Sequence, residues 1–141
     1  MLKYKLFFLV MCLFPALLLM GCLNKDLNQL TRVDIEIVKT DGNYEESFMI
    51  TDEKTVDALR EIFKQIEWNP NEEAKMARKE DIKATLFFEY DENMPERLFE
   101  YKIWFIQSNE TAKIISNNSK EGYGRLEKEN AQTLENILLN K

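Results

Sequence analysis

The sequence predicts an α+β domain in which two helices pack on one face of an antiparallel sheet of about five strands. Several short segments alternate apolar and polar residues, as strands with one buried face do. Two further segments carry apolar residues at helical spacing. The predicted order is strand, strand, helix, three strands, helix. The chain of 141 residues can hold one such domain after a short leader.

The first two strands are predicted to form a hairpin. Residues 33–37 alternate between apolar and polar, and a second alternating run covers residues 44–50. Asp41-Gly42 lies between the two runs and is a typical turn signal. The two strands should therefore pair antiparallel.

A first helix is predicted over residues 53–66. Its apolar residues recur every three or four positions, and Thr51 or Asp52 can cap its start. The pattern ends before Pro70, and the charged residues 71–80 are predicted to form a loop.

The second half of the chain predicts a meander followed by a helix. Strands are expected at residues 81–90, 97–107 and 111–116, from alternating apolar residues. Gly122-Tyr123-Gly124 is interpreted as a tight turn, because glycine tolerates positive φ. It leads into a terminal helix over residues 127–139.

The composition excludes several classes of function. The sequence contains no histidine, so Ser-His and Cys-His catalysis and ordinary zinc sites are ruled out. The net charge of −6 repels nucleic acid, which is therefore not expected as a partner. No cofactor or metal is predicted.

The N-terminus has the pattern of a secretory signal. Two lysines within residues 1–5 precede fifteen apolar positions, residues 6–20. A membrane-spanning helix needs about 20 apolar residues, and this run stops short. Export from the cytoplasm is the predicted outcome.

The end of the leader resembles the lipobox of bacterial lipoproteins. Leu19, Met20, Gly21 and Cys22 occupy its four positions. This resemblance implies a diacylglyceryl thioether on Cys22 and cleavage before it, with the protein anchored on the extracytoplasmic face of the cell membrane. The alternative is a free or buried cysteine beside an ordinary cleavage site or an uncleaved anchor.

These observations divide the chain into three parts. Residues 1–21 are predicted to be the signal peptide. Residues 22–29 are predicted to be the lipidated cysteine and a tether, because they are short, mostly polar and lack periodicity. Residues 30–141 are predicted to form the single extracytoplasmic domain.

The sheet face opposite the helices is a candidate interaction surface. Alternation places Phe87, Trp104 and Ile106 on that face, and an apolar patch on a charged sheet can bind a partner. The alternative is that loop 67–80 folds over these side chains and covers them.

Carboxylates are the abundant catalytic residue type that remains. Glu89, Asp91 and Glu100 could approach one another near the predicted hairpin and act as an acid and base pair. Charged residues on the solvent face of a strand are the more ordinary explanation. No catalytic residue is assigned.

Most of residues 30–140 resembles the YhfM-like family of small lipoproteins from Gram-positive bacteria, whose role is uncharacterised. The similar features are the lipidated leader, Trp68-Asn69-Pro70, the strand start at Asp81, the aromatic run 101–105, and Gly122-Tyr123-Gly124-Arg125-Leu126. The resemblance implies a surface-anchored single domain and supplies no activity.

The sequence therefore predicts a non-enzymatic, membrane-anchored domain at the cell envelope. Its predicted partners are the membrane, through the lipid on Cys22, and an envelope protein or peptide. Two alternatives are a binder of small molecules or peptides that resembles an inhibitor module, and a carboxylate-based hydrolase.

Overall fold

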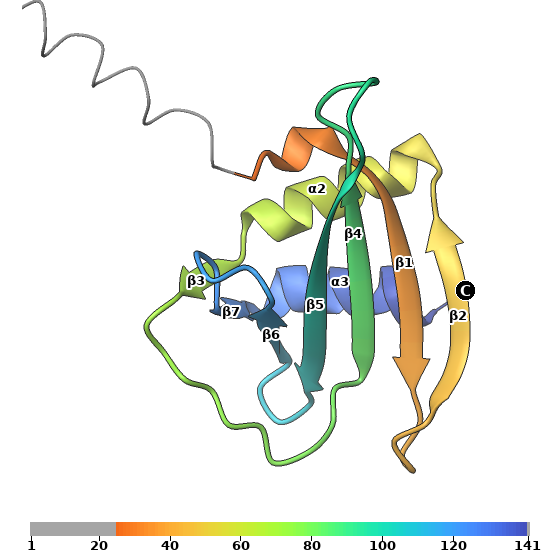
Figure 1. Cartoon of the computed structure of the whole chain (residues 1–141). Helices are drawn as coiled ribbons and strands as arrows, with labels where there is room; N and C mark the ends of the chain where they lie inside the picture. Colours follow the sequence, from red (N-terminus) through yellow and green to blue (C-terminus); the bar gives the residue numbers. More distant parts are fainter. Residues whose placement is uncertain (1–24, 141) are drawn as a thin grey trace, which may run out of the picture.

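The computed structural model describes residues 25–140, which form two layers (Figure 1). An antiparallel sheet makes one layer, and two helices cover one of its faces. Within these residues the strand order is β2-β1-β4-β5-β6-β7-β3. The elements are the 3₁₀ turn η2 (Leu27–Gln29), β1 (Leu30–Val38), β2 (Tyr44–Ile50), α2 (Glu53–Lys64), β3 (Glu67–Asn69), β4 (Ile82–Phe88), β5 (Arg97–Ile106), β6 (Thr111–Ser116), β7 (Tyr123–Leu126) and α3 (Lys128–Leu139).

The predicted class and the two helices are confirmed, but the sheet has seven strands rather than about five. The two additional strands are β3 and β7, which pair antiparallel at one edge. Trp68 lies opposite Gly124 in this pair. Strands of three and four residues are too short for alternation to reveal them. The segment interpreted as a tight turn is therefore only partly a turn, because Tyr123 and Gly124 belong to β7.

The predicted hairpin of β1 and β2 is present. The pair keeps one register from Val33 opposite Ile50 as far as Ile37, and Gly42 adopts a φ of 84° in the turn. β1 also pairs with β4, so it is hydrogen-bonded along both edges. The first strand of the sequence is thus an interior strand of the sheet.

Both helices bury one apolar side. Asp52 caps α2 by accepting a hydrogen bond of 3.0 Å from the Thr55 backbone N–H. α2 and α3 also contact each other. No helix within residues 25–140 has both the length and the apolarity needed to cross a membrane. The side chains that the helices bury are Val56, Leu59, Ile62 and Phe63 from α2, and Ala131, Leu134 and Leu138 from α3.

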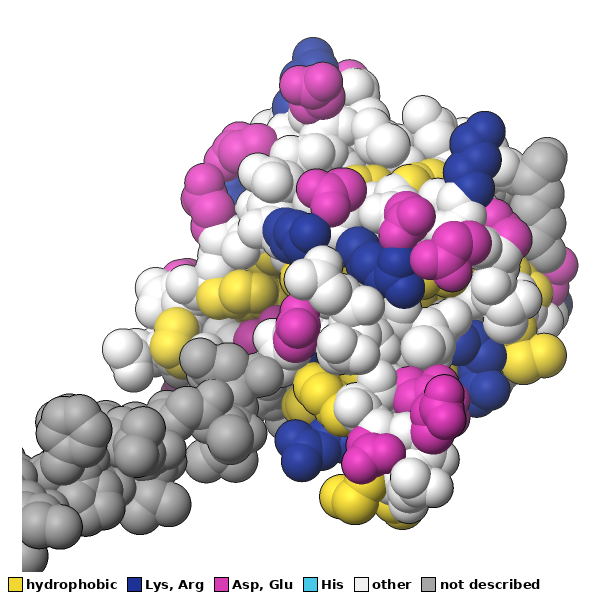
Figure 2. Space-filling view, turned by 90° about the horizontal axis from the view of Figure 1, so that it is seen from above, with side chains coloured by type: hydrophobic (Ala, Val, Ile, Leu, Met, Phe, Trp, Pro, Cys, Tyr) yellow, Lys and Arg dark blue, Asp and Glu magenta, His cyan; other side chains and the backbone are white. Residues whose placement is uncertain are grey.

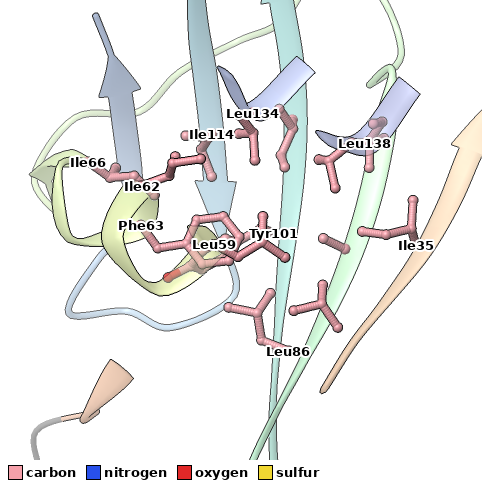
Figure 3. Packing of buried hydrophobic residues seen from close by; sticks show 14 of the residues in the cluster. Ile35, Leu59, Ile62, Phe63, Ile66, Leu86, Tyr101, Ile114, Leu134 and Leu138 are labelled. Atoms are coloured by element: carbon pink, nitrogen blue, oxygen red, sulfur yellow. The ribbon is translucent and has the colours of Figure 1, made fainter. Parts of the chain in front are cut away.

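The core lies between the helices and the sheet (Figure 3). Phe63 of α2 meets Tyr101 of β5 edge to face, with ring centroids 5.4 Å apart. The aliphatic side chains of Leu59, Leu86 and Leu134 belong to the same cluster and are fully buried. Tyr101 thus carries a hydroxyl group into an otherwise apolar layer.

Residues 25–29, predicted as part of a tether, instead pack against the domain. Leu27 contacts the core, and the Glu89 backbone N–H donates to the Gln29 carbonyl over 3.0 Å. The Asp26 side chain caps η2 by accepting from the Asn28 backbone N–H. Short polar segments resemble tethers in sequence, but here their backbone groups find partners on the sheet.

Candidate functional site

The predicted interaction surface does not form an exposed patch. Phe87 and Trp104 lie on the face opposite the helices, yet only 9% and 4% of their surfaces are exposed. The Trp104 indole N–H donates to the Arg78 carbonyl over 2.9 Å, so the loop after β3 covers the indole ring. The Arg32 guanidinium carbon lies 3.6 Å from the centre of the Phe87 ring. Ile106 is partly exposed at the end of β5.

The predicted carboxylates are not gathered into a site. The register of β4 and β5 places Glu100 opposite Thr85, whereas Phe88 lies opposite Arg97. Glu89 and Asp91 follow β4 and are therefore several positions along the sheet from Glu100. The described part of the chain contains no cluster of acidic or cysteine side chains that could hold a metal ion. Cys22 lies outside the described residues.

A buried polar cluster occupies the end of the domain where the described chain begins. The Lys25 ammonium donates to both Glu121 carboxylate oxygens, at 2.9 and 3.0 Å, and to the Tyr101 hydroxyl. Tyr101 in turn donates to Glu121 Oε2 over 2.7 Å. The side chains of Lys25 and Glu121 are only 6% and 13% exposed. An ion pair this far from solvent strongly affects both stability and local chemistry.

The loop between β6 and β7 holds the Glu121 carboxylate in place. The Ser116 hydroxyl and the Asn118 amide donate to Glu121 Oε1, at 3.1 and 3.3 Å. The Asn118 carbonyl accepts from the backbone N–H groups of Glu121 and Gly122 over 3.0 Å each. Gly122 has a positive φ of 66°, which glycine adopts without the steric cost that other residues incur. The carboxylate is therefore fixed by side chains and by the turn that presents it.

Burial shifts the pKa values of two groups in the cluster. It lowers the pKa of the Lys25 ammonium below its ordinary value, although the charge of Glu121 opposes this change. It also raises the pKa of the Tyr101 hydroxyl far above its ordinary value, and the neighbouring Glu121 carboxylate raises that pKa further. Tyr101 consequently stays protonated and donates a hydrogen bond. Perturbed titratable groups of this kind are more frequent at functional sites than elsewhere.

A cavity of about 390 Å³ opens beside the cluster. Its volume falls in the usual range for small-molecule sites, about 300–1,000 Å³. A larger hollow of about 510 Å³ lies over β1, β2 and β4 on the opposite face, away from the buried ion pair. One part of the smaller cavity is apolar, formed by Leu27, Phe63, Ile66 and Trp68, and the other is polar, formed by Lys25, Lys64, Asn118, Lys120 and Glu121.

Sequence reasoning missed this site. Lys25 and Glu121 are 96 positions apart, and both lie outside the periodic segments. The tether interpretation removed Lys25 from the domain, and Glu121 precedes a glycine turn that carries no chemical signature. The folded arrangement of residues 25–29 is what brings the two together, and no local pattern encodes it.

No protein-family model and no curated protein matches the chain. A solved structure of a thioesterase-like protein from Clostridium sporogenes has a similar fold, with a TM-score of 0.52. The two sequences are 19% identical, and the match covers 79% of this chain and 96% of that one. This likeness contradicts the prediction of an interaction domain at the cell envelope, because the similar structure is described as thioesterase-like. At this identity the structure of the thioesterase-like protein establishes the α+β fold of the present chain.

Proposed function

We propose that the protein hydrolyses an acyl ester or thioester in the cavity beside Lys25. The observation that carries this proposal is a carboxylate, Glu121, held at the wall of a cavity whose other side is apolar. The apolar part suits an acyl chain, and the lysine and amide groups suit the polar end of the substrate. The thioesterase-like description of a protein with a similar fold supports the same class of reaction.

The proposed step starts from the buried cluster. Glu121 accepts a proton from water as the water oxygen bonds to the acyl carbon. Because Glu121 loses its charge in this step, the Lys25 ammonium can turn an N–H group away from it and, with the Asn118 amide, donate to the oxygen that becomes negative. The bond from the acyl carbon to the ester oxygen or thioester sulfur then breaks. The leaving group takes the proton from Glu121, and the products are a carboxylic acid and an alcohol or thiol.

We expect the protein to hydrolyse p-nitrophenyl esters, with kcat/KM increasing with acyl chain length until the cavity is filled. Glu121→Gln should lower kcat/KM by about 100-fold, because general base catalysis is lost. The measurement is release of p-nitrophenol by the full-length protein in detergent, at a concentration verified by absorbance.

Two further variants separate chemistry from folding. Glu110→Gln removes an exposed carboxylate that is paired with Lys128 on the surface, and it should leave activity unchanged. Lys25→Met combined with Glu121→Gln removes both charges together, so this protein should stay folded by circular dichroism and lack activity. Full activity in the folded double variant would contradict the role of Glu121.

We also propose that Cys22 carries a lipid that anchors the protein on the extracytoplasmic face of the membrane. The support is the leader pattern of residues 1–20 and the four lipobox positions that end at Cys22. Palmitate fed to the producing bacterium should label the wild-type chain but not Cys22→Ala. Cys12→Ala, which changes the other cysteine, is the matched control and should be labelled normally. Equal labelling of wild type and Cys22→Ala would rule out this attachment site.

A further inference from the structure

Lys25 joins the cavity to the anchor. It lines the cavity, and it follows Cys22 by three residues. Three residues of fully extended chain span at most about 11 Å. A lipid on Cys22 would therefore hold this wall of the cavity within about 11 Å of the membrane anchor.

The contacts of residues 25–29 prevent this connection from lengthening. Lys25 is held by Glu121 and Tyr101, as described above, and the Asp26 backbone N–H donates to the Tyr90 hydroxyl over 3.4 Å. The Gln29 carbonyl accepts from Glu89. Releasing more tether would break a buried ion pair, which is costly. The domain is therefore held with a defined end towards the anchor.

The same end exposes apolar side chains. The hairpin between β4 and β5 extends beyond residues 25–29 (Figure 1), and Tyr90, Met94 and Leu98 on it are 38%, 59% and 53% exposed. Figure 2 looks onto this end and shows hydrophobic side chains among charged ones. Exposed apolar groups beside an anchor suit contact with lipid headgroups and the upper part of the acyl chains. The acidic residues at the hairpin tip, Asp91, Glu92 and Glu96, limit this contact to the headgroup level.

The cavity lining matches a lipid in both of its parts. Leu27, Ile66 and Trp68 offer an apolar surface to an acyl chain, and Phe63 extends it. Lys25, Lys64 and Lys120 bring three ammonium groups to the polar part, beside the Glu121 carboxylate. Lys25 and Lys64 are themselves paired, with Glu121 and with Glu61. A phosphate group is the anion that membrane lipids present at this depth, and ammonium groups bind it well.

We propose that the cavity faces the bilayer surface and that its substrate is a phosphate-bearing membrane lipid, from which an acyl chain is removed. This inference rests on the proposed hydrolytic function and on the anchor at Cys22. Water adds to the acyl carbon, the ester bond to glycerol breaks, and the products are a fatty acid and a lysolipid. The short connection supplies the substrate at high effective concentration, because the cavity stays at the membrane surface.

The position of the cavity can be tested with the two tryptophans of the chain. Trp68 lines the cavity, whereas Trp104 lies under the loop on the opposite face. The full-length lipidated protein is reconstituted into phosphatidylcholine vesicles that contain brominated acyl chains, which quench tryptophan on contact. The Trp104→Phe variant, which retains Trp68, should lose fluorescence by about twofold, because a bound acyl chain would be largely enclosed by the cavity. Trp68→Phe, which retains Trp104, should be nearly unaffected. Equal quenching of the two variants, or none in either, would overturn the membrane-facing position.

The identity of the substrate is tested by lengthening the chain between Cys22 and Lys25. A Gly/Ser linker of about 15 residues inserted after Leu23 should lower fatty acid release from the vesicles by about tenfold, because a long flexible linker lowers the effective concentration of the cavity at the membrane surface. Hydrolysis of a p-nitrophenyl ester by the same variant should match that of the wild type. Ester hydrolysis without fatty acid release from vesicles in the wild type would overturn the lipid substrate and leave the proposed function intact. Absence of both activities would contradict the proposed function itself.

Discussion

Replacing Glu121 with alanine is expected to lower the free energy of unfolding by about 3 kcal/mol. The Lys25 ammonium would then remain buried without its charged partner. It lies 4.4 Å from the centre of the Tyr101 ring and within 5.4 Å of the Phe88 and Phe99 rings. These rings attract the ammonium but do not replace the lost carboxylate. Urea unfolding at neutral pH, followed by tryptophan fluorescence, measures the loss.

The pH dependence of the stability of Glu121→Ala tests whether the unpaired lysine causes the loss of stability. Burial already lowers the pKa of Lys25 in the folded protein, and the variant lacks the Glu121 charge and hydrogen bond that oppose this shift. Between the lowered folded pKa and the ordinary value of 10.5, the unfolded chain binds more protons at Lys25 than the folded chain does. The stability of the variant should therefore rise with pH across this window, relative to the wild type. A loss that is independent of pH would argue against an unpaired lysine.

A matched control for this prediction is Glu61→Ala. Glu61 also pairs with a lysine, Lys64, over 2.9 Å, but its side chain is 71% exposed. Exposed ion pairs contribute at most about 1 kcal/mol, so this change should have little effect. A comparable loss in both variants would contradict the importance of burial.

Gly124→Ala is expected to lower the free energy of unfolding by about 2–3 kcal/mol. A Cβ atom at position 124 would lie 2.5 Å from Ile66 Cγ2 and 2.6 Å from the Trp68 ring. The ring cannot move away freely, because it also packs on Tyr101, with centroids 5.4 Å apart. Relief of the clash would displace β3 from β7. Chemical denaturation of the purified variant measures the cost.

A double-mutant cycle tests whether the clash with Trp68 causes the loss of stability in Gly124→Ala. Trp68→Leu in the Gly124→Ala background should recover part of the loss, which gives a coupling energy of about 1 kcal/mol. Gly42→Ala is the control, because a Cβ there meets only Lys79 Cδ at 3.6 Å and its cost comes from the positive φ. Additive effects of Gly124→Ala and Trp68→Leu would contradict this explanation.

The long periodic segments of the sequence were sufficient to predict the class of fold. β1, β4 and β5 bury one face, so alternation reveals them, and α2 repeats its apolar residues over several turns. β3 and β7 were missed because their pairing depends on Gly124 making room for Trp68, which is a property of two distant segments. A periodic pattern within one segment does not reveal a pairing between two distant segments.

The candidate site was harder to predict than the fold for a related reason. The orientation of Phe87 and Trp104 followed from alternation, and covering of these side chains by loop 67–80 was one of the two alternatives that the sequence left open. The choice between the two depended on tertiary packing, which places Arg32 on Phe87 and the loop before β4 over Trp104. Lys25 and Glu121 gain their chemical character only from burial, because in water they would be an ordinary lysine and an ordinary glutamate. Sequence reasoning about isolated residues cannot assign that burial.

The interior position of β1 also determines how the domain would respond to mechanical load. Tension applied at the N-terminus would act first on the Lys25–Glu121 ion pair and then along β1. Because β1 is hydrogen-bonded to β2 on one edge and to β4 on the other, the load would be shared between two ladders pulled lengthwise. A lengthwise pull opposes many hydrogen bonds together, whereas peeling an edge strand breaks them one after another. When tension comes from the N-terminal side, the strand that follows Lys25 is thus held along both of its edges.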